Sequence, residues 1–191
     1  MVRIRNEFGM AVPRDGDEMK SSSVQSLVPS VFVDGSNFFY MQNQSLGWFI
    51  DPKRMLDYIV SKYNGNLHEA KYYTGVDPHD QKQKSFIKAL SFMGYTVMEK
   101  VMDEDPEKKR SPYHTTDIVA DMFSATEHCN AIVLVSGRDC FTYPMDLLKK
   151  QGIQIMVVST NDHCSNKLRS IAGSNFMDCS SLQEFLEKQE K

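Results

Sequence analysis

The chain contains 191 residues, of which 41% are hydrophobic and 25% carry a charge, values typical of a globular domain. This length suits one domain with a sizeable buried core and a short extension. The net charge of −3 and the isoelectric point near 5.9 exclude a global attraction to nucleic acids. Nucleic-acid binding would therefore require a local basic patch.

The sequence patterns argue against secretion and against a membrane segment. No run of 18 apolar residues occurs, and residues 1–5 lack the apolar core of a signal peptide. The four cysteines, Cys129, Cys140, Cys164 and Cys179, are irregularly spaced and form no Cys-x-x-Cys pair. We interpret them as reduced packing residues, which predicts a cytoplasmic protein with no membrane partner.

Residues 1–30 differ in pattern from the rest of the chain. They combine mixed charges, a run of three serines and two prolines, and they show no sustained hydrophobic period. We therefore expect residues 1–30 to be an arm or extension and residues 31–191 to be the domain.

From residue 31 onward, apolar strand patterns alternate with helical patterns of ten or so residues. Strands are predicted near residues 31–33, 68–73, 95–98, 131–135, 153–158 and 175–177, and helices near 51–63, 81–93, 115–128, 144–151, 166–171 and from 180. In the second helix we expect Phe86, Ala89, Leu90 and Met93 to face inward. The alternation indicates βαβ units, and hence an α/β fold with a mainly parallel central sheet. Two apolar segments after the first strand, 38–41 and 48–50, fit either the core or an interface.

Carboxylates fall where the topology of such a sheet brings residues together. Asp34 ends the first strand and Asp139 closely follows the fourth, and ligands bind beyond the carboxyl ends of parallel strands. Asp117 and Asp121 lie four residues apart in a predicted helix, so they share one face of it. Asn37 is placed to orient a carboxylate, a water or a phosphate oxygen.

Gathered carboxylates indicate a divalent cation. Two of them about 4 Å apart repel by about 4 kcal/mol at an effective dielectric constant near 20, so a cation or a proton must lie between them. Oxygen ligands without thiolates suit Mg²⁺ or Mn²⁺, which activate water and neutralise phosphate in phosphodiester cleavage. The alternative is that Asp34 caps a turn or helix and that the Asp117–Asp121 face is solvated.

Five sequence blocks together resemble the NYN domain, in the LabA-like branch of the PIN-like nuclease superfamily. They are VFVDGSN at 31–37, AKYYTG at 70–75, ADM at 120–122, IVLVSG at 132–137 and SNKL at 165–168. The resemblance implies a Rossmann-like, PIN-like three-layer sandwich. It also implies a metal-dependent ribonuclease whose acidic residues hold Mg²⁺ or Mn²⁺.

The resemblance assigns roles to individual residues. Asp34 matches the family's first acidic position, Asn37 its companion asparagine, and Asp121 the aspartate of the helix motif. The preceding family aspartate corresponds to Thr115 here, and Asp117 could replace it through a shift.

The strand-end motif departs from the family pattern Ser-Gly-Asp-x-Asp-Phe. This chain has Arg138 and Cys140 at the two aspartate positions, with Asp139 between them. Three outcomes are open. Asp139 completes a metal site while Arg138 clamps phosphate, or Arg138 replaces the metal by pairing with Asp34 or Asp121, or the correspondence of residues is shifted.

The first functional hypothesis is a metal-dependent ribonuclease acting on RNA phosphodiesters through an altered acidic site. Its expected catalytic residues are Asp34, Asn37, Asp121 and Asp139, and its expected metal ligands are Asp34, Asp117, Asp121 and Asp139. The expected contacts to single-stranded or structured RNA are Ser36, Ser136, Arg138, Lys108, Lys109, Arg110 and Tyr113. For the basic triplet at 108–110, a solvated loop that neutralises residues 103–105 is the alternative.

Two further hypotheses remain open. The first is a catalytically impaired NYN-like module that binds RNA or a protein partner, including a second copy of the chain. The second is a hydrolase of small phosphoesters on the same scaffold. Arg138 separates the enzyme from the impaired module, because an ion-paired site loses stability when this residue becomes aspartate.

Overall fold

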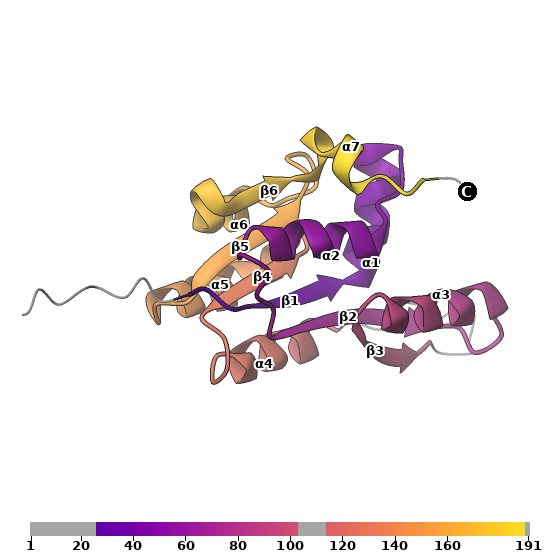
Figure 1. Cartoon of the computed structure of the whole chain (residues 1–191), viewed down its shortest axis with the longest axis horizontal. Coiled ribbons are helices and arrows are strands. Elements are labelled where there is room, and N and C mark those ends of the chain that lie inside the picture. Colours follow the sequence, from indigo (N-terminus) through magenta and orange to yellow (C-terminus); the bar gives the residue numbers. More distant parts are fainter. Residues whose placement is uncertain (1–25, 103–113, 190–191) are drawn as a thin grey trace, which may run out of the picture.

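Six parallel strands form the central layer of the protein, in the order β3-β2-β1-β4-β5-β6 (Figure 1). The computed structural model describes residues 26–102 and 114–189. The strands are β1 (Pro29–Asp34), β2 (Glu69–Val76), β3 (Thr96–Val101), β4 (Ala131–Val135), β5 (Gln154–Ser159) and β6 (Phe176–Asp178). The α/β sandwich and its parallel sheet were both predicted, and both are confirmed.

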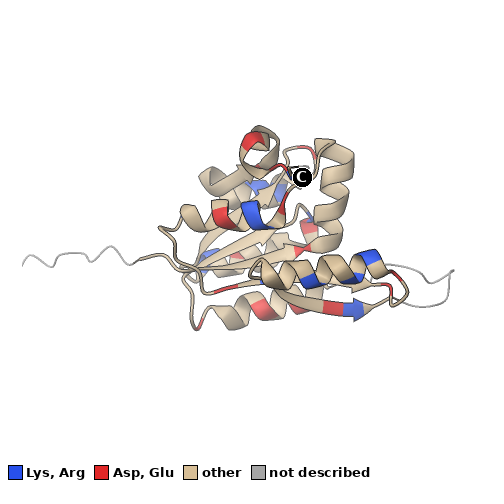
Figure 2. Ribbon diagram, turned by 45° about the vertical axis from the view of Figure 1, so that its right-hand side comes forward, with Lys and Arg blue, Asp and Glu red and all other residues tan. Residues whose placement is uncertain are grey.

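Helices cover both faces of the sheet, which makes three layers (Figures 1 and 2). One face carries α1 (Gly35–Met41), α2 (Pro52–Ser61), α3 (Gln81–Phe92) and α7 (Gln183–Leu186). The other carries α4 (Thr115–Ala125), α5 (Thr142–Lys150) and α6 (Asn166–Ala172). A π-helical segment, Gln42–Leu46, follows α1.

The central strands have two apolar faces because both are covered. In β1, Val31 and Val33 pack into the cluster under α2, whereas Phe32 packs into the cluster under α4 and α5. Strand β4 alternates in the same way, with Val133 on the first face and Leu134 on the second. This explains the continuous apolar runs in the sequence.

The strand order places a topological switch point between β1 and β4. The chain builds the sheet outward from β1 through β2 to β3, and then returns to the other side of β1 with β4. The connections after β1 and β4 therefore diverge to opposite faces. In sheets of this kind, ligands bind at the carboxyl ends of the two strands, and we call this position the switch-point crevice.

Several local predictions are corrected by the structure. Phe86 was expected to face inward, but 41% of its surface is exposed, and its neighbour Ile87 is buried instead. Cys140 was interpreted as a packing residue but is exposed. The segment 38–41 was left open between core and interface: it forms most of α1, with Phe38 and Met41 buried.

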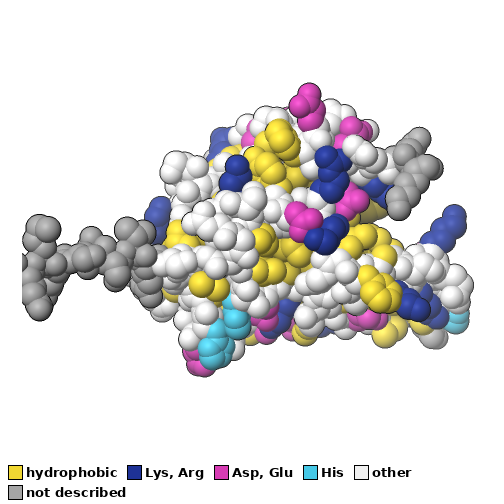
Figure 3. Space-filling model, viewed as in Figure 1, with side chains coloured by type: hydrophobic (Ala, Val, Ile, Leu, Met, Phe, Trp, Pro, Cys, Tyr) yellow, Lys and Arg dark blue, Asp and Glu magenta, His cyan; other side chains and the backbone are white. Residues whose placement is uncertain are grey.

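The limits of the described chain affect two further expectations. Strand β1 begins at Pro29, slightly before the predicted start of the domain, and residues 1–25 of the predicted arm lie outside the described residues. Within the described ranges, no helix has the length and apolar character needed to cross a membrane. Exposed apolar side chains interrupt the polar surface over α2 and α3 (Figure 3).

Candidate functional site at the switch point

Asp34 lies at the carboxyl end of β1, where the connections of the switch point diverge. Its side chain caps α1, because Oδ1 accepts a hydrogen bond from the backbone N–H of Asn37 at 3.3 Å. The residue is only 4% exposed. Its other oxygen, Oδ2, accepts from Ser136 Oγ at 3.2 Å. A carboxylate buried to this degree requires such partners.

Arg138 supplies the positive charge that Asp34 needs. Its Nη1 lies 3.4 Å from Asp34 Oδ2, and its own backbone N–H donates to Ser136 Oγ at 3.3 Å. The Arg138 side chain is 31% exposed, so solvent reaches it while it pairs with a buried carboxylate. Of the three outcomes considered from the sequence, the structure has Arg138 paired with Asp34.

A hydrogen-bonded clamp joins the ends of β1 and β4. Gly137 N donates to Asn37 Oδ1 at 2.8 Å, which directs the Asn37 amide nitrogen toward His163 Nε2 at 3.1 Å. Since the amide nitrogen can only donate, Nε2 acts as the acceptor and the ring proton belongs on Nδ1. Burial lowers the pKa of His163, which favours this neutral form.

Gly137 permits the close contact that the clamp requires. A Cβ atom at this position would lie 2.2 Å from the carbonyl oxygen of His163 and 2.9 Å from Cα of Cys164. The Gly137 carbonyl in turn accepts from Ser165 N at 2.8 Å. The glycine of the Ser-Gly motif is therefore explained by the approach of two backbones.

Asp121 is held by two residues of β2. Its Oδ2 accepts from the hydroxyl of Tyr73 at 2.6 Å, and its Oδ1 lies 3.3 Å from Lys71 Nζ. Lys71 is paired with Phe32 of β1, and Tyr73 is paired with Asp34. Burial, followed by the hydrogen bond to Asp121, raises the pKa of Tyr73.

Asp117 and Asp139 also have partners of their own. Lys100 bonds to Asp117, whose Oδ2 also lies 3.3 Å from His114 Nδ1. The hydrogen bond from Lys100 is the main reason that the pKa of Asp117 is lowered. Asp139 is exposed and accepts from Thr142 Oγ1 at 3.1 Å, at the start of α5.

The side chains present do not fit a divalent cation. The four carboxylates expected as ligands have four separate sets of partners, and the most buried one faces a guanidinium. Within residues 26–102 and 114–189, no group of three His, Cys, Asp or Glu side chains could hold a metal ion. Mg²⁺ and Mn²⁺ both need several oxygen ligands around one point.

The expected RNA contacts are only partly described. Ser36 is half-buried in the first turn of α1, and Ser136 is buried beside Asp34. Lys108, Lys109, Arg110 and Tyr113 lie outside the described residues. Sequence reasoning missed His163, Tyr73 and Lys71. Lys71 and Tyr73 lie in the AKYYTG block, which resembles the family but assigned them no role. His163 lies close to the SNKL block, which says nothing of Asn37, 126 positions away.

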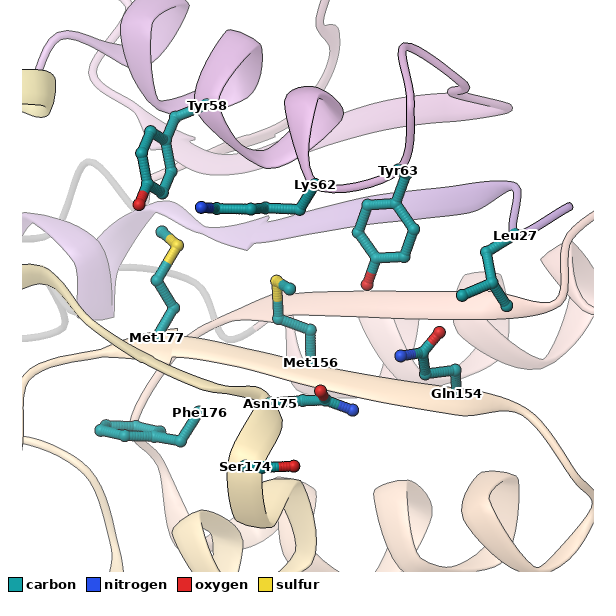
Figure 4. A pocket seen from close by; sticks show the side chains of 10 residues that line it. All are labelled: Leu27, Tyr58, Lys62, Tyr63, Gln154, Met156, Ser174, Asn175, Phe176 and Met177. Atoms are coloured by element: carbon teal, nitrogen blue, oxygen red, sulfur yellow. The ribbon is translucent and has the colours of Figure 1, made fainter.

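A separate cavity of about 320 Å³ lies at another part of the sheet (Figure 4). Its lining includes Tyr63, after α2, and Gln154, the first residue of β5, so it opens near the amino ends of the strands. Burial raises the pKa of Tyr63 to about 12. None of the side chains of the Asp34 crevice lines this cavity.

Strand order and crevice define the class of the protein: a doubly wound α/β domain with an aspartate–arginine pair at its switch point. The family model of the NYN domain matches residues 30–181, and the chain belongs to this family. It is 36% identical over 169 residues to the low amplitude and bright protein LabA of Synechococcus elongatus, covering 85% of this chain and 89% of LabA. The predicted membership in the LabA-like branch is thereby confirmed.

A solved structure supports the fold independently. A protein of unknown function from Vibrio parahaemolyticus superimposes with a TM-score of 0.73 at 20% identity, covering 86% of this chain and 98% of that one. This likeness shows the fold alone. Membership in the NYN family, a family of PIN-like nucleases, supports an RNA-related function.

Proposed function

We propose that this protein is an NYN domain that binds RNA at the switch-point crevice without metal-dependent cleavage. The observation that carries the proposal is the contact between Arg138 Nη1 and Asp34 Oδ2 at 3.4 Å. Arginine is the side chain best suited to bind a phosphate group, and a carboxylate behind it fixes its position.

The surroundings of Arg138 support binding rather than hydrolysis. A hydrolytic site needs a cation to activate water, and Asp34, the carboxylate at its centre, is already neutralised by a guanidinium. Asp121, the second ligand expected from the family, is engaged by Tyr73 and Lys71. The Arg138 side chain is nevertheless 31% exposed, so a phosphate oxygen can reach it from solvent.

Fluorescence anisotropy with a labelled single-stranded RNA and a labelled hairpin tests this proposal. In EDTA we expect binding that weakens with salt, and intact RNA after incubation with Mn²⁺. Arg138→Ala should weaken binding several-fold and reduce the slope of log affinity against log salt by about 0.7 for the single strand. Lys150→Ala, at the end of α5, serves as the control.

Two results would overturn the proposal. Absence of RNA binding by the wild type would remove it outright. Cleavage that needs Mn²⁺ and disappears in Asp34→Asn would establish the metal-dependent ribonuclease instead. Calorimetry of the EDTA-treated protein with Mn²⁺ provides a second readout, for which we expect no heat of specific binding.

A further inference from the structure

Helix α3 carries a concentration of positive charge that is unusual for this acidic chain. Its twelve residues, Gln81–Phe92, include Lys82, Lys84 and Lys88 and no acidic residue, whereas the whole chain has a net charge of −3. Figure 2 shows basic bands along this helix and no acidic band within it. Asp80 precedes the helix as its N-cap, and the next acidic residue along the chain is Glu99.

The basic residues of α3 alternate with exposed aromatic rings. Lys84, Lys88 and Phe92 are spaced by four residues and therefore form one stripe, and Lys82 and Phe86 form a second stripe in the same way. Phe92 is 81% exposed and Phe86 is 41% exposed. In Figure 3, basic and apolar side chains lie next to each other over this part of the surface. The helix is anchored from its opposite side by the buried Ile87 and Leu90.

The three lysines are available for a partner. None of them forms an ion pair with any residue in the described ranges, although Lys53, Lys71, Lys100 and Lys150 all do. The ring of an exposed phenylalanine forms no hydrogen bonds with water. On a basic helix, it offers a surface on which a base can stack.

The helix begins at the same edge of the sheet as the Arg138 crevice. Strand β2 continues three residues past Tyr73, the partner of Asp34, and α3 follows after a short turn. Tyr72 bridges α1 and α3, because its ring contacts Phe38 at 6.3 Å and Phe86 at 6.1 Å between centroids. Through this ring, α1, which begins directly after Asp34, is linked to α3.

We propose that α3 is a second RNA-binding surface, on which Lys82, Lys84 and Lys88 contact phosphates while Phe86 and Phe92 stack on bases of a single strand. This inference rests on the proposed RNA-binding function and extends the path of the strand away from the crevice. Single-stranded RNA fits because its bases are free to stack, whereas a duplex offers only its backbone.

A pair of matched charge reversals tests the surface. Lys84→Glu/Lys88→Glu changes the net charge by −4. The control Lys62→Glu/Lys150→Glu changes it by the same amount, but at the ends of α2 and α5. In anisotropy titrations with a labelled single-stranded oligonucleotide, we expect the α3 variant to lose at least about tenfold in affinity. Its salt slope should fall by about 1.4, since each lost phosphate contact contributes about 0.7 for single strands. The control should lose much less.

A ring substitution separates stacking from charge. Phe92→Ser should lower the affinity by about fivefold or more at unchanged salt slope, because stacking does not depend on counterions. Equal losses in the two charge-reversal variants would overturn the inference, because they would report net charge alone. An α3 variant that binds RNA like the wild type would also overturn it.

The two proposals fail in distinguishable ways. If Arg138→Ala weakens binding and the α3 variants do not, RNA binding at the crevice is supported and RNA binding on α3 is contradicted. If the α3 variants weaken binding and Arg138→Ala does not, the reverse holds. Binding of the wild type to vesicles with anionic lipid, lost in Lys84→Glu/Lys88→Glu and accompanied by no RNA binding, would overturn both.

Discussion

The guanidinium of Arg138 and the carboxylate of Asp34 meet across the junction of β4 and β1, with Nη1 3.4 Å from Oδ2. One partner is almost fully buried, and the other is partly exposed. The pair therefore neutralises a charge that the sheet has withdrawn from water, and it does so where the strands of an α/β domain present their ligands.

Removal of this arginine should destabilise the fold. In Arg138→Leu, Asp34 keeps its hydrogen bonds from Asn37 N and Ser136 Oγ but loses its countercharge. We expect the free energy of unfolding to fall by about 1–2 kcal/mol, the low end for a charged hydrogen bond, because Arg138 is partly exposed. Urea denaturation measures the loss, and Arg138→Lys should recover part of it. Unchanged stability in Arg138→Leu would mean that the pair contributes nothing.

Replacement of the arginine by aspartate should make the stability of the protein depend on a divalent metal ion. Arg138→Asp places a second carboxylate near Asp34 with no cation between them, which costs more stability than Arg138→Leu does. We expect millimolar Mn²⁺ to raise the Tm of Arg138→Asp and to leave the Tm of the wild type unchanged. Thermal unfolding with and without EDTA measures this. A wild-type Tm that rises as much as that of the variant would contradict the ion-pair interpretation.

Asp121 should stabilise the fold through its hydrogen bond with Tyr73. The hydroxyl of Tyr73 donates to Asp121 Oδ2 at 2.6 Å, so Tyr73→Phe removes one charge-assisted hydrogen bond. We expect a loss of about 1–2 kcal/mol, and a coupling energy of about 1 kcal/mol in the double-mutant cycle with Asp121→Ala. Urea denaturation of the four proteins gives the cycle. Additive losses would show that the bond contributes nothing to stability.

The sequence predicts the architecture well because burial leaves a strong pattern. Strand β4 has the predicted bounds, Ala131–Val135, since a strand covered on both faces is apolar throughout. Helix α1 was missed, because its seven residues include Gly35, Ser36 and Asn37, which favour turns in isolation. The Asp34 cap and the burial of Phe38 and Met41 stabilise it.

The site was harder to predict because spacing fixes the face of a helix but not its height against a strand. Asp117 and Asp121 do share one face of α4, as the four-residue spacing indicates. Only the packing of α4 decides that the partners of Asp121 are Lys71 and Tyr73 of β2. The contact between Asn37 and His163 depends on the conformation of the loop after β5, which the sequence pattern does not predict.

Gly137 should tolerate no side chain. The Cβ of Gly137→Ala would lie 2.2 Å from the carbonyl oxygen of His163, a backbone atom that cannot rotate away. The strand end or the loop after β5 must shift, and we expect a loss of at least about 2 kcal/mol in unfolding free energy. Ser91→Ala, at an exposed position of α3, should stay within about 0.5 kcal/mol of the wild type. Similar stability of the two variants would contradict the close approach.

The clamp between Asn37 and His163 should weaken in acid. Burial lowers the pKa of His163 in the folded protein below its usual value near 6.5. The unfolded chain therefore takes up the proton first, and the contribution of His163 to stability is complete above pH about 6.5. As the pH falls from this value to the folded pKa, that contribution is progressively lost, because a protonated Nε2 cannot accept from Asn37 Nδ2.

Denaturation in urea from pH about 7.5 to 5 measures how the free energy of unfolding changes with pH. His163→Gln should flatten it, since glutamine accepts the same hydrogen bond without titrating, whereas His79→Gln, at an exposed site, should leave it unchanged. If His163→Gln and the wild type lost stability in parallel over this range, the neutral clamp would not be the source of the pH dependence.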